Sequence, residues 1–396
     1  MIQTEIDDGS TPKAGDIANL GQPIFLKNFN LAGISAEVAQ GGQKVKIWTS
    51  MALTSDQDLF QKVIGNISGA IERAARSVGE HTNLSRAQTV FLVLRSDNSG
   101  ELWVDKAAMC TYNRLKRPGP MAAGTVLFEQ DVADVTGLWF PLVEVGRQDR
   151  ILCIFREGWR FALYFDLNHD GKLDIERAKR ALGMLYRRMR YADRYASLAH
   201  ETTFGAMVAA GWFPFLELGD SEIKDLLAAI GSDFSLNRIE EELIAAFNGN
   251  RLERLFSRWM ERIHLKEREA ILRPAVDAFK SSEPVAVIKI ILSEIEGVMS
   301  DVYYELNGSR PYRSKVLPDF MIDLAEQRAD GKDTLFFPVE FGKYLKDYTY
   351  ADFGPDDVGK AGSRHAVSHG RVPGNQYTMV RALQALLTLD QIAFYI

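Results

Sequence analysis

Apolar side chains recur every three to four residues between Thr54 and Gly79, which is the spacing of one face of an α-helix. This stripe consists of Leu59, Val63, Ile67, Ile71 and Ala74. Thr54 or Ser55 can cap the start of such a helix, and Gly79 offers a stop. The sequence therefore predicts an amphipathic helix over residues 54–79.

The pattern then changes to short runs of β-branched and apolar residues, which predict strands over 89–94 and 101–104. Two more runs, 150–155 and 159–165, lie on either side of Glu157-Gly158, which is a hairpin signal. We expect these strands to form an antiparallel sheet.

Helical spacing returns between Asp174 and His200, with apolar residues on one side and arginines on the other. The apolar side consists of Ile175, Ala178, Leu182, Leu185 and Met189. The opposite side carries Arg177, Arg180, Arg187, Arg190 and Arg194. The pattern predicts one long basic amphipathic helix.

The residues Gly211-Trp212-Phe213-Pro214 interrupt this pattern, and most of the chain after them has helical periodicity. The helical segments are 220–230, 236–247, 251–261, 266–281, 284–306 and 377–396. We therefore predict an α+β fold with an N-terminal antiparallel sheet and flanking helices, followed by an all-α helical bundle. The predicted parts are a loosely structured arm (1–45), an α+β domain (46–210) and a helical domain (211–396).

Composition narrows the functional classes. The 396 residues are 46% hydrophobic and 25% charged, as in ordinary globular proteins, and the net charge of −6 argues against nucleic-acid binding over the whole surface. Cys110 and Cys153 show no paired metal or disulfide spacing, so we expect a reducing, cytoplasmic location. The first 22 residues lack the features of a signal peptide, and no apolar run approaches the roughly 18 residues of a membrane span, so we expect no membrane association.

The segment Arg364-His365-Ala366-Val367-Ser368-His369 carries the strongest chemical signal. Ser363 can cap a short helix here, and Gly370 with Pro373 can stop it. A guanidinium fork binds phosphate, and an imidazole transfers protons near neutral pH, so the pair suits a metal-independent cleavage of RNA through the 2′-hydroxyl. A separation of five residues is about 140° around a helix, however, so Arg364 and His369 do not share one face unless the arginine curls back or a second subunit completes the site.

This string resembles the Arg-x4–6-His motif of the HEPN superfamily (higher eukaryotes and prokaryotes nucleotide-binding domain), in which a polar residue such as His365 often follows the arginine. Bacterial relatives carry a similar Arg-His-Ala-x-x-His-Gly string that opens a late helix. They also carry an apolar helix with a Glu-Gly pair, similar to residues 291–297, and a final helix similar to residues 383–390. The resemblance covers roughly residues 220–396.

The resemblance implies a metal-independent endoribonuclease, dimeric, with two motifs facing each other across the interface, of the kind found in bacterial toxin–antitoxin and phage-defence systems. It implies that Arg364 contacts phosphate, that His369 is the catalytic acid or base, and that His365 is a polar accessory. Several family members are catalytically silent binding modules. A non-enzymatic RNA- or nucleotide-binding protein, or a regulatory protein that binds a protein partner, is therefore the alternative. We expect no cofactor.

The same region permits a second interpretation, because His365 and His369 are four residues apart on one helical face, as in zinc sites. No third ligand is evident nearby, although Asp352, Asp356 and Asp357 lie in the preceding loop. Our prediction is that no metal binds here.

Three other features have a chemical interpretation beside a plain structural one. Residues 166–174 match the first positions of a calcium loop, but Arg177 replaces its final glutamate, which favours an ordinary turn. The basic helix is either a solvated face or an RNA groove lined by Arg180, Arg187, Arg188, Arg190 and Arg194. Among the carboxylates of residues 294–305, Glu294 and Asp301 share a helical face, either exposed to solvent or lining the HEPN cleft.

Overall fold

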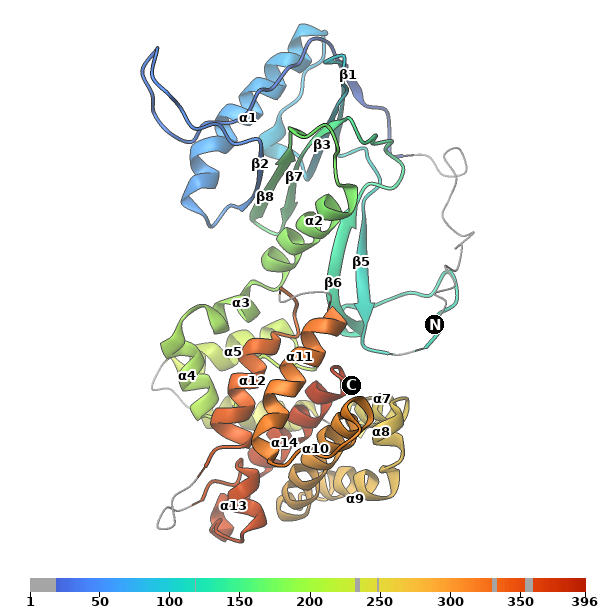
Figure 1. The fold of residues 1–396 in the computed structure, drawn as a ribbon, viewed down its shortest axis with the longest axis vertical. Helices are drawn as coiled ribbons and strands as arrows, with labels where there is room; N and C mark the ends of the chain where they lie inside the picture. Colours follow the sequence, from blue (N-terminus) through green and yellow to red (C-terminus); the bar gives the residue numbers. More distant parts are fainter. Residues whose placement is uncertain (1–18, 118, 232–235, 248, 330–332, 353–358) are drawn as a thin grey trace. The chain divides into compact units, whose positions relative to one another are not determined.

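The computed structural model describes residues 19–117, 119–231, 236–247, 249–329, 333–352 and 359–396. The chain divides into two compact units. The first unit comprises Met1–Tyr112 and Val135–Arg190, and the second comprises Asn113–Asp134 and Tyr191–Ile396. Figure 1 shows the mixed α/β character of the first unit and the helical character of the second.

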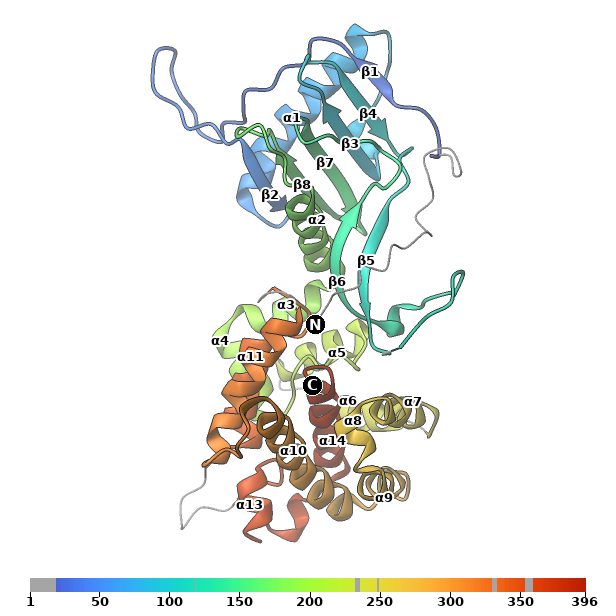
Figure 2. The ribbon, with the colours of Figure 1, turned by 45° about the vertical axis from the view of Figure 1, so that its right-hand side comes forward.

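The first unit is built on a six-stranded antiparallel sheet with the order β1-β4-β3-β7-β8-β2 (Figure 2). Its strands are β1 (Ile24–Leu26), β4 (Gly100–Val104), β3 (Thr89–Leu94), β7 (Arg150–Glu157), β8 (Arg160–Asp166) and β2 (Ser50–Thr54). The predicted strands and the predicted hairpin are confirmed, with Glu157 paired to Arg160 across the turn. Part of the predicted arm, 1–45, instead supplies the edge strand β1, which pairs with β4; residues 1–18 lie outside the described residues.

Two helices cover the two faces of this sheet. Helix α1 (Asp58–Ser77) packs its predicted apolar stripe against one face, where Leu92 and Leu152 lie. Helix α2 (Ile175–Arg190) covers the other face, where Phe91 and Cys153 lie. The alternation of side chains along each strand produces these two cores, because neighbouring residues point to opposite faces.

The predicted helix 174–200 is interrupted. It consists of α2 and α3 (Ala192–Ala199), separated at Tyr191, whose backbone is not helical. The boundary between the two units falls at this break, before Gly211. Each half buries its own face, so the continuous periodicity of the sequence does not correspond to one continuous helix.

The strands β5 (Cys110–Leu115) and β6 (Val132–Trp139) form a separate two-stranded sheet. Residues Asn113–Asp134 of this hairpin belong to the second unit. There Asp134 accepts a hydrogen bond of 2.6 Å from the Thr334 hydroxyl, and both side chains are buried.

The second unit is a helical assembly. Besides α3, its helices are α4 (Glu201–Ala209), α5 (Asp220–Ile230), α6 (Leu236–Ala246), α7 (Gly249–Met260), α8 (Ile263–Lys266), α9 (Glu269–Lys280), α10 (Pro284–Asn307), α11 (Leu317–Ala329), α12 (Pro338–Tyr344), α13 (Arg364–Ser368) and α14 (Met379–Ala393). A π-helical turn, Leu345–Thr349, follows α12. Every residue from Ala382 to Ala393 is buried, so α14 is the central helix of this unit.

Among the described residues, no helix combines the length and apolarity that crossing a membrane requires.

Candidate functional site

Residues 364–368 form the short helix α13 in the second unit, and His369 follows directly. The Ser363 hydroxyl caps this helix by accepting a hydrogen bond of 3.4 Å from the Ala366 backbone N–H. Gly370 adopts a positive φ of 64° just after His369 and ends the helical path. The predicted cap and stop are therefore confirmed, because both depend on residues adjacent in sequence.

The Arg364 side chain is directed at helix α10. Its Nε forms an ion pair with the Glu296 carboxylate, and about a quarter of each side chain is exposed (23% and 25%). Within the described residues, the two terminal amino groups of Arg364 form no hydrogen bond. The carboxylate thus contacts the Nε edge of the guanidinium, and the hydrogen-bonding positions of the terminal amino groups stay unfilled by these residues.

The two histidines of the segment lie next to each other. The rings of His365 and His369 are nearly parallel, at 4°, with centroids 6.5 Å apart. His369 is exposed, whereas His365 is half-buried and its Nε2 has no hydrogen-bond partner among the described residues. Burial, and then the nearby positive charge of Arg364, lower the pKa of His365. This ring is therefore mostly neutral at pH 7 and can accept a proton.

Other carboxylates of α10 also hold basic side chains. Glu294 and Asp301 share one helical face, as predicted, and both bind the guanidinium of Arg268. Arg310 forms a second ion pair with Asp301 at 2.9 Å. Burial alone would raise the pKa of Asp301, but the hydrogen bonds from Arg268 and Arg310 lower it. The charges of Glu294, Asp301, Arg268 and Arg310 are thus mutually compensated.

Among the acidic residues considered for a metal, Asp352 acts electrostatically on His365 but also has a basic partner. Asp352 forms an ion pair of 2.5 Å with Lys315, and Asp356 and Asp357 lie outside the described residues. Within the part of the chain that the structure describes, no three His, Cys, Asp or Glu side chains are grouped so that they could hold a metal ion.

The loop 166–174 uses its polar side chains to make a turn. Asp166 accepts a hydrogen bond of 2.8 Å from the Asn168 backbone, and the Asn168 amide donates to the carbonyls of Arg147 and Asp149. Asp174 accepts from the Arg177 N–H at 2.9 Å and so caps α2. These contacts support the ordinary turn that the sequence favours.

The five arginines considered for an RNA groove separate into two groups. Arg180, Arg188 and Arg190 are exposed. Arg187 is buried and donates to the Val135 carbonyl at 2.6 Å. Arg194 is also buried, donates to the carbonyls of residues 214, 215 and 218, and pairs with Asp220. The prediction that Arg187 and Arg194 lie on an open face is therefore wrong. Both guanidiniums are buried and donate hydrogen bonds to main-chain carbonyls.

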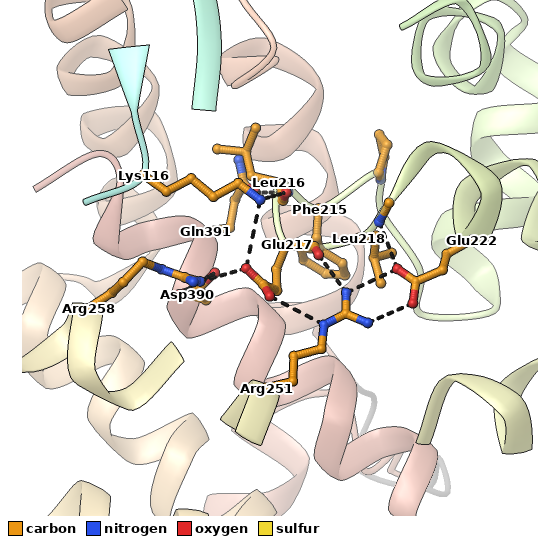
Figure 3. A network of polar contacts seen from close by, with 12 residues as sticks. Lys116, Phe215, Leu216, Glu217, Leu218, Glu222, Arg251, Arg258, Asp390 and Gln391 are labelled. Atoms are coloured by element: carbon orange, nitrogen blue, oxygen red, sulfur yellow. Dashed lines mark hydrogen bonds and ion pairs between the residues drawn. The ribbon is translucent and has the colours of Figure 1, made fainter. Parts of the chain in front are cut away.

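A buried ionic network in the second unit is absent from the sequence predictions (Figure 3). The Lys116 ammonium donates to the Leu216 carbonyl at 2.7 Å and lies 3.8 Å from Glu217. Glu217 also pairs with Arg251 and Arg258, at 3.3 and 2.7 Å. Arg258 in turn contacts Asp390, which accepts a hydrogen bond of 2.9 Å from the Trp259 indole. These charges come from the residue that follows β5, from α7, from α14 and from the loop before α5, so no local sequence pattern could reveal them.

Burial changes the pKa values inside this network. It lowers the pKa of Lys116 to about 8 and raises the pKa of Asp390. Burial alone would also raise the pKa of Glu217, but the positive charges of Arg258, Lys116 and Arg251 outweigh burial and lower it. Glu217 is thus the central negative charge of the network.

Comparison of the chain with protein-family models, with curated proteins and with solved structures finds no match.

Proposed function

We propose that the second unit is a HEPN-type, metal-independent endoribonuclease, with its site at Arg364, His365 and His369. One observation carries the proposal: within the described residues the terminal amino groups of Arg364 form no hydrogen bond, and the same short segment carries the exposed His369. Such a fork fits two phosphate oxygens, and an imidazole within reach can transfer a proton. The resemblance of residues 364–369 to the HEPN motif supports the same assignment.

The proposed reaction needs no group beyond the RNA and these side chains. The 2′-hydroxyl oxygen attacks the adjacent phosphorus, and a neutral imidazole takes its proton. The bond from phosphorus to the 5′-oxygen breaks, and an imidazolium protonates that oxygen. The products are a 2′,3′-cyclic phosphate and a 5′-hydroxyl. Arg364 stabilises the extra negative charge that develops on the phosphoryl oxygens.

In this scheme His369 is the acid or base, because its side chain is exposed to solvent. His365 is the polar accessory, because its half-buried ring lies parallel to that of His369. A second copy of the chain would supply the second imidazole that the reaction uses, in keeping with the dimer that the resemblance implies. Within the bacterial systems in which such enzymes serve, this activity fits a toxin or a defence nuclease.

The test is the cleavage of a single-stranded RNA by the full-length protein in EDTA, compared with the same strand carrying 2′-deoxyribose throughout. We expect cleavage of the RNA only, with cyclic phosphate at the new 3′ ends. Cleavage of the deoxy strand, or products with a free 3′-hydroxyl, would contradict the proposed chemistry. If neither strand is cleaved but the RNA is bound, the alternative of a non-enzymatic RNA-binding module is favoured.

A further inference from the structure

The connection between helices α10 and α11 combines positive charge with exposed aromatic rings. Between positions 307 and 317 it carries no acidic residue and three basic ones, namely Arg310, Arg313 and Lys315. Tyr312 lies between the two arginines and is 95% exposed, and Tyr304 in the last turn of α10 is 50% exposed. Interleaved basic and aromatic side chains are typical of surfaces that bind single-stranded nucleic acid.

Each of the two arginines lies near one of the two rings. The Arg310 guanidinium is 5.7 Å from the centroid of Tyr304, and the Arg313 guanidinium is 6.0 Å from the centroid of Tyr312. Within the part of the chain that the structure describes, the Arg313 side chain forms no hydrogen bond or ion pair. Its N–H groups are thus available to an anion next to an exposed ring. We name these four residues the tyrosine–arginine surface.

The first contact that brings this surface near the proposed site involves helix α10, which lies beside α13 (Figures 1 and 2). Arg310 donates a hydrogen bond of 3.2 Å to the Ser300 hydroxyl and pairs with Asp301 at 2.9 Å. Ser300 follows Glu296, the partner of Arg364, by one helical turn on the same side, about 6 Å along the axis. The guanidiniums of Arg310 and Arg364 therefore contact neighbouring turns of one helix.

A second, separate contact joins the other end of the segment to the same site. Lys315 forms an ion pair of 2.5 Å with Asp352, and Asp352 acts electrostatically on His365. The segment from Arg310 to Lys315 is thus tied at both ends to residues that contact or influence the proposed site.

We propose that the tyrosine–arginine surface binds the unpaired bases and the phosphates of a single-stranded RNA beside the scissile phosphate. This inference rests on the proposed nuclease and specifies the form of RNA that its site accepts. An exposed tyrosine stacks on the face of any base, and a neighbouring guanidinium binds the phosphate. In a duplex, the neighbouring bases cover those faces, so the rings have nothing to stack on.

The test measures the affinity of the full-length protein for a fluorescent single-stranded oligonucleotide that carries 2′-O-methyl groups throughout. Such a strand keeps its bases and phosphates but lacks the attacking hydroxyl, so binding is measured without cleavage. We expect Tyr312→Ala to bind it about tenfold more weakly, because one stacking contact is lost. Tyr312→Phe keeps a ring and should bind within about twofold of the wild type.

The matched control is Trp159→Ala in the first unit. Trp159 is 69% exposed, and the Arg160 guanidinium lies 4.4 Å from its ring centroid, so this variant removes a similar exposed ring beside an arginine. Its affinity for the strand should equal that of the wild type. Weakening by Trp159→Ala as large as that by Tyr312→Ala would overturn the assignment of the bases to this surface.

Salt dependence and a duplex separate stacking from charge. Tyr312→Ala should leave the dependence of affinity on salt unchanged, whereas Arg313→Gln should reduce its slope by about one. A duplex of the same sequence should bind more weakly than the single strand, and Tyr312→Ala should not change its affinity. Wild-type affinity of Tyr312→Ala for the single strand, or an equal loss for strand and duplex, would overturn the inference.

These measurements also distinguish this inference from the nuclease on which it rests. If the strand is bound through Tyr312 but unmodified RNA is not cleaved, the base contacts are supported and the nuclease fails. If Tyr312→Ala binds the strand and cleaves RNA like the wild type, the inference fails and the nuclease stands. A wild type that does not bind the strand overturns the inference and favours a protein partner for this surface.

Discussion

Glu217 is the residue on which the buried charges of the second unit converge. It is 8% exposed at its side chain and contacts Lys116, Arg251 and Arg258. Removing charges from water costs several kcal/mol per ion, and only close partners offset that cost. The network therefore depends on keeping this carboxylate ionised, and the loss of its charge would leave three cations in poorly solvated surroundings.

We expect Glu217→Gln to lower the free energy of unfolding by about 3 kcal/mol, because it leaves buried cations without their shared counter-ion. Glu201→Gln is the control, since the Glu201 side chain is 89% exposed and pairs only with Lys343 at 3.4 Å. That control should change stability by less than about 0.5 kcal/mol. Urea unfolding of the three proteins measures both effects. Equal stability of Glu217→Gln and the wild type would show that the network contributes nothing to folding.

Lys116 should make stability depend on pH in the alkaline range. Its pKa is lowered by burial from the ordinary 10.5 to about 8 in the folded protein. Between these values the unfolded chain binds more protons than the folded chain, so this residue stabilises the fold increasingly as pH rises from about 8 to 10.5. As pH falls through the same window, that contribution is lost.

The variant Lys116→Met lacks this proton equilibrium. Across the window, the free energy of unfolding of the wild type should therefore rise relative to that of Lys116→Met, as measured by urea unfolding at a series of pH values. The exposed Lys224 on α5 gives the control Lys224→Met, whose curve should run parallel to that of the wild type. A constant difference between the wild type and Lys116→Met would contradict the assigned pKa.

At the scale of the elements, helix α2 and strand β6 of the first unit approach each other closely at Gly183 and Gly137. A Cβ added at Gly183 would lie 2.4 Å from the Gly137 backbone, which cannot move without separating helix and strand. We expect Gly183→Ala to destabilise the protein by about 1–3 kcal/mol through overpacking. Gly65→Ala in α1 meets no atom within 4 Å and should stabilise by about 0.5–1 kcal/mol through helix propensity. Thermal midpoints that shift in the same direction would refute this packing account.

This contact also shows what the apolar periodicity of residues 175–189 could not predict. The apolar stripe of residues 175–189 correctly indicated the side of α2 that packs on the sheet. It could not show that β6 covers another side of the same helix, where Arg187 donates to Val135. A helix covered on two sides still appears amphipathic when the second contact uses a glycine and an arginine instead of apolar residues.

Local signals otherwise served well at the element scale. The six helices predicted after residue 211 correspond to α5, α6, α7, α9, α10 and α14, because their apolar spacing is regular and caps or breaks separate them. Helices α11 and α12 were not predicted, since prolines and short length obscure their pattern. At the site, Ser363 and Gly370 acted as predicted, but Glu296, the ionic partner of Arg364, is distant in sequence and only the fold brings it near.

At the scale of the whole molecule, the chain passes between the two units at residues 112–113, 134–135 and 190–191. The second unit consequently contains residues 113–134, including Lys116 of the buried network. A fragment beginning at residue 211 would lack this residue. Experiments on the proposed nuclease should therefore use the full-length chain.

A homodimer is expected at this scale, because the proposed reaction uses two imidazoles and the HEPN resemblance implies motifs facing across an interface. Sedimentation equilibrium over a range of protein concentrations measures the mass directly. A monomer at the concentrations at which RNA is cleaved would contradict the shared site, and a dimer at those concentrations would agree with it.

The measurement that tests the central claim most directly is the rate of RNA cleavage in EDTA by the full-length wild type, Arg364→Ala and His369→Ala. The account predicts that each substitution lowers the rate about 100-fold or more, because one removes the phosphate contact and the other removes the proton transfer. Arg238→Ala and His200→Ala, which remove exposed side chains of the same two types, should retain wild-type rates. Wild-type cleavage by both Arg364→Ala and His369→Ala would contradict the account.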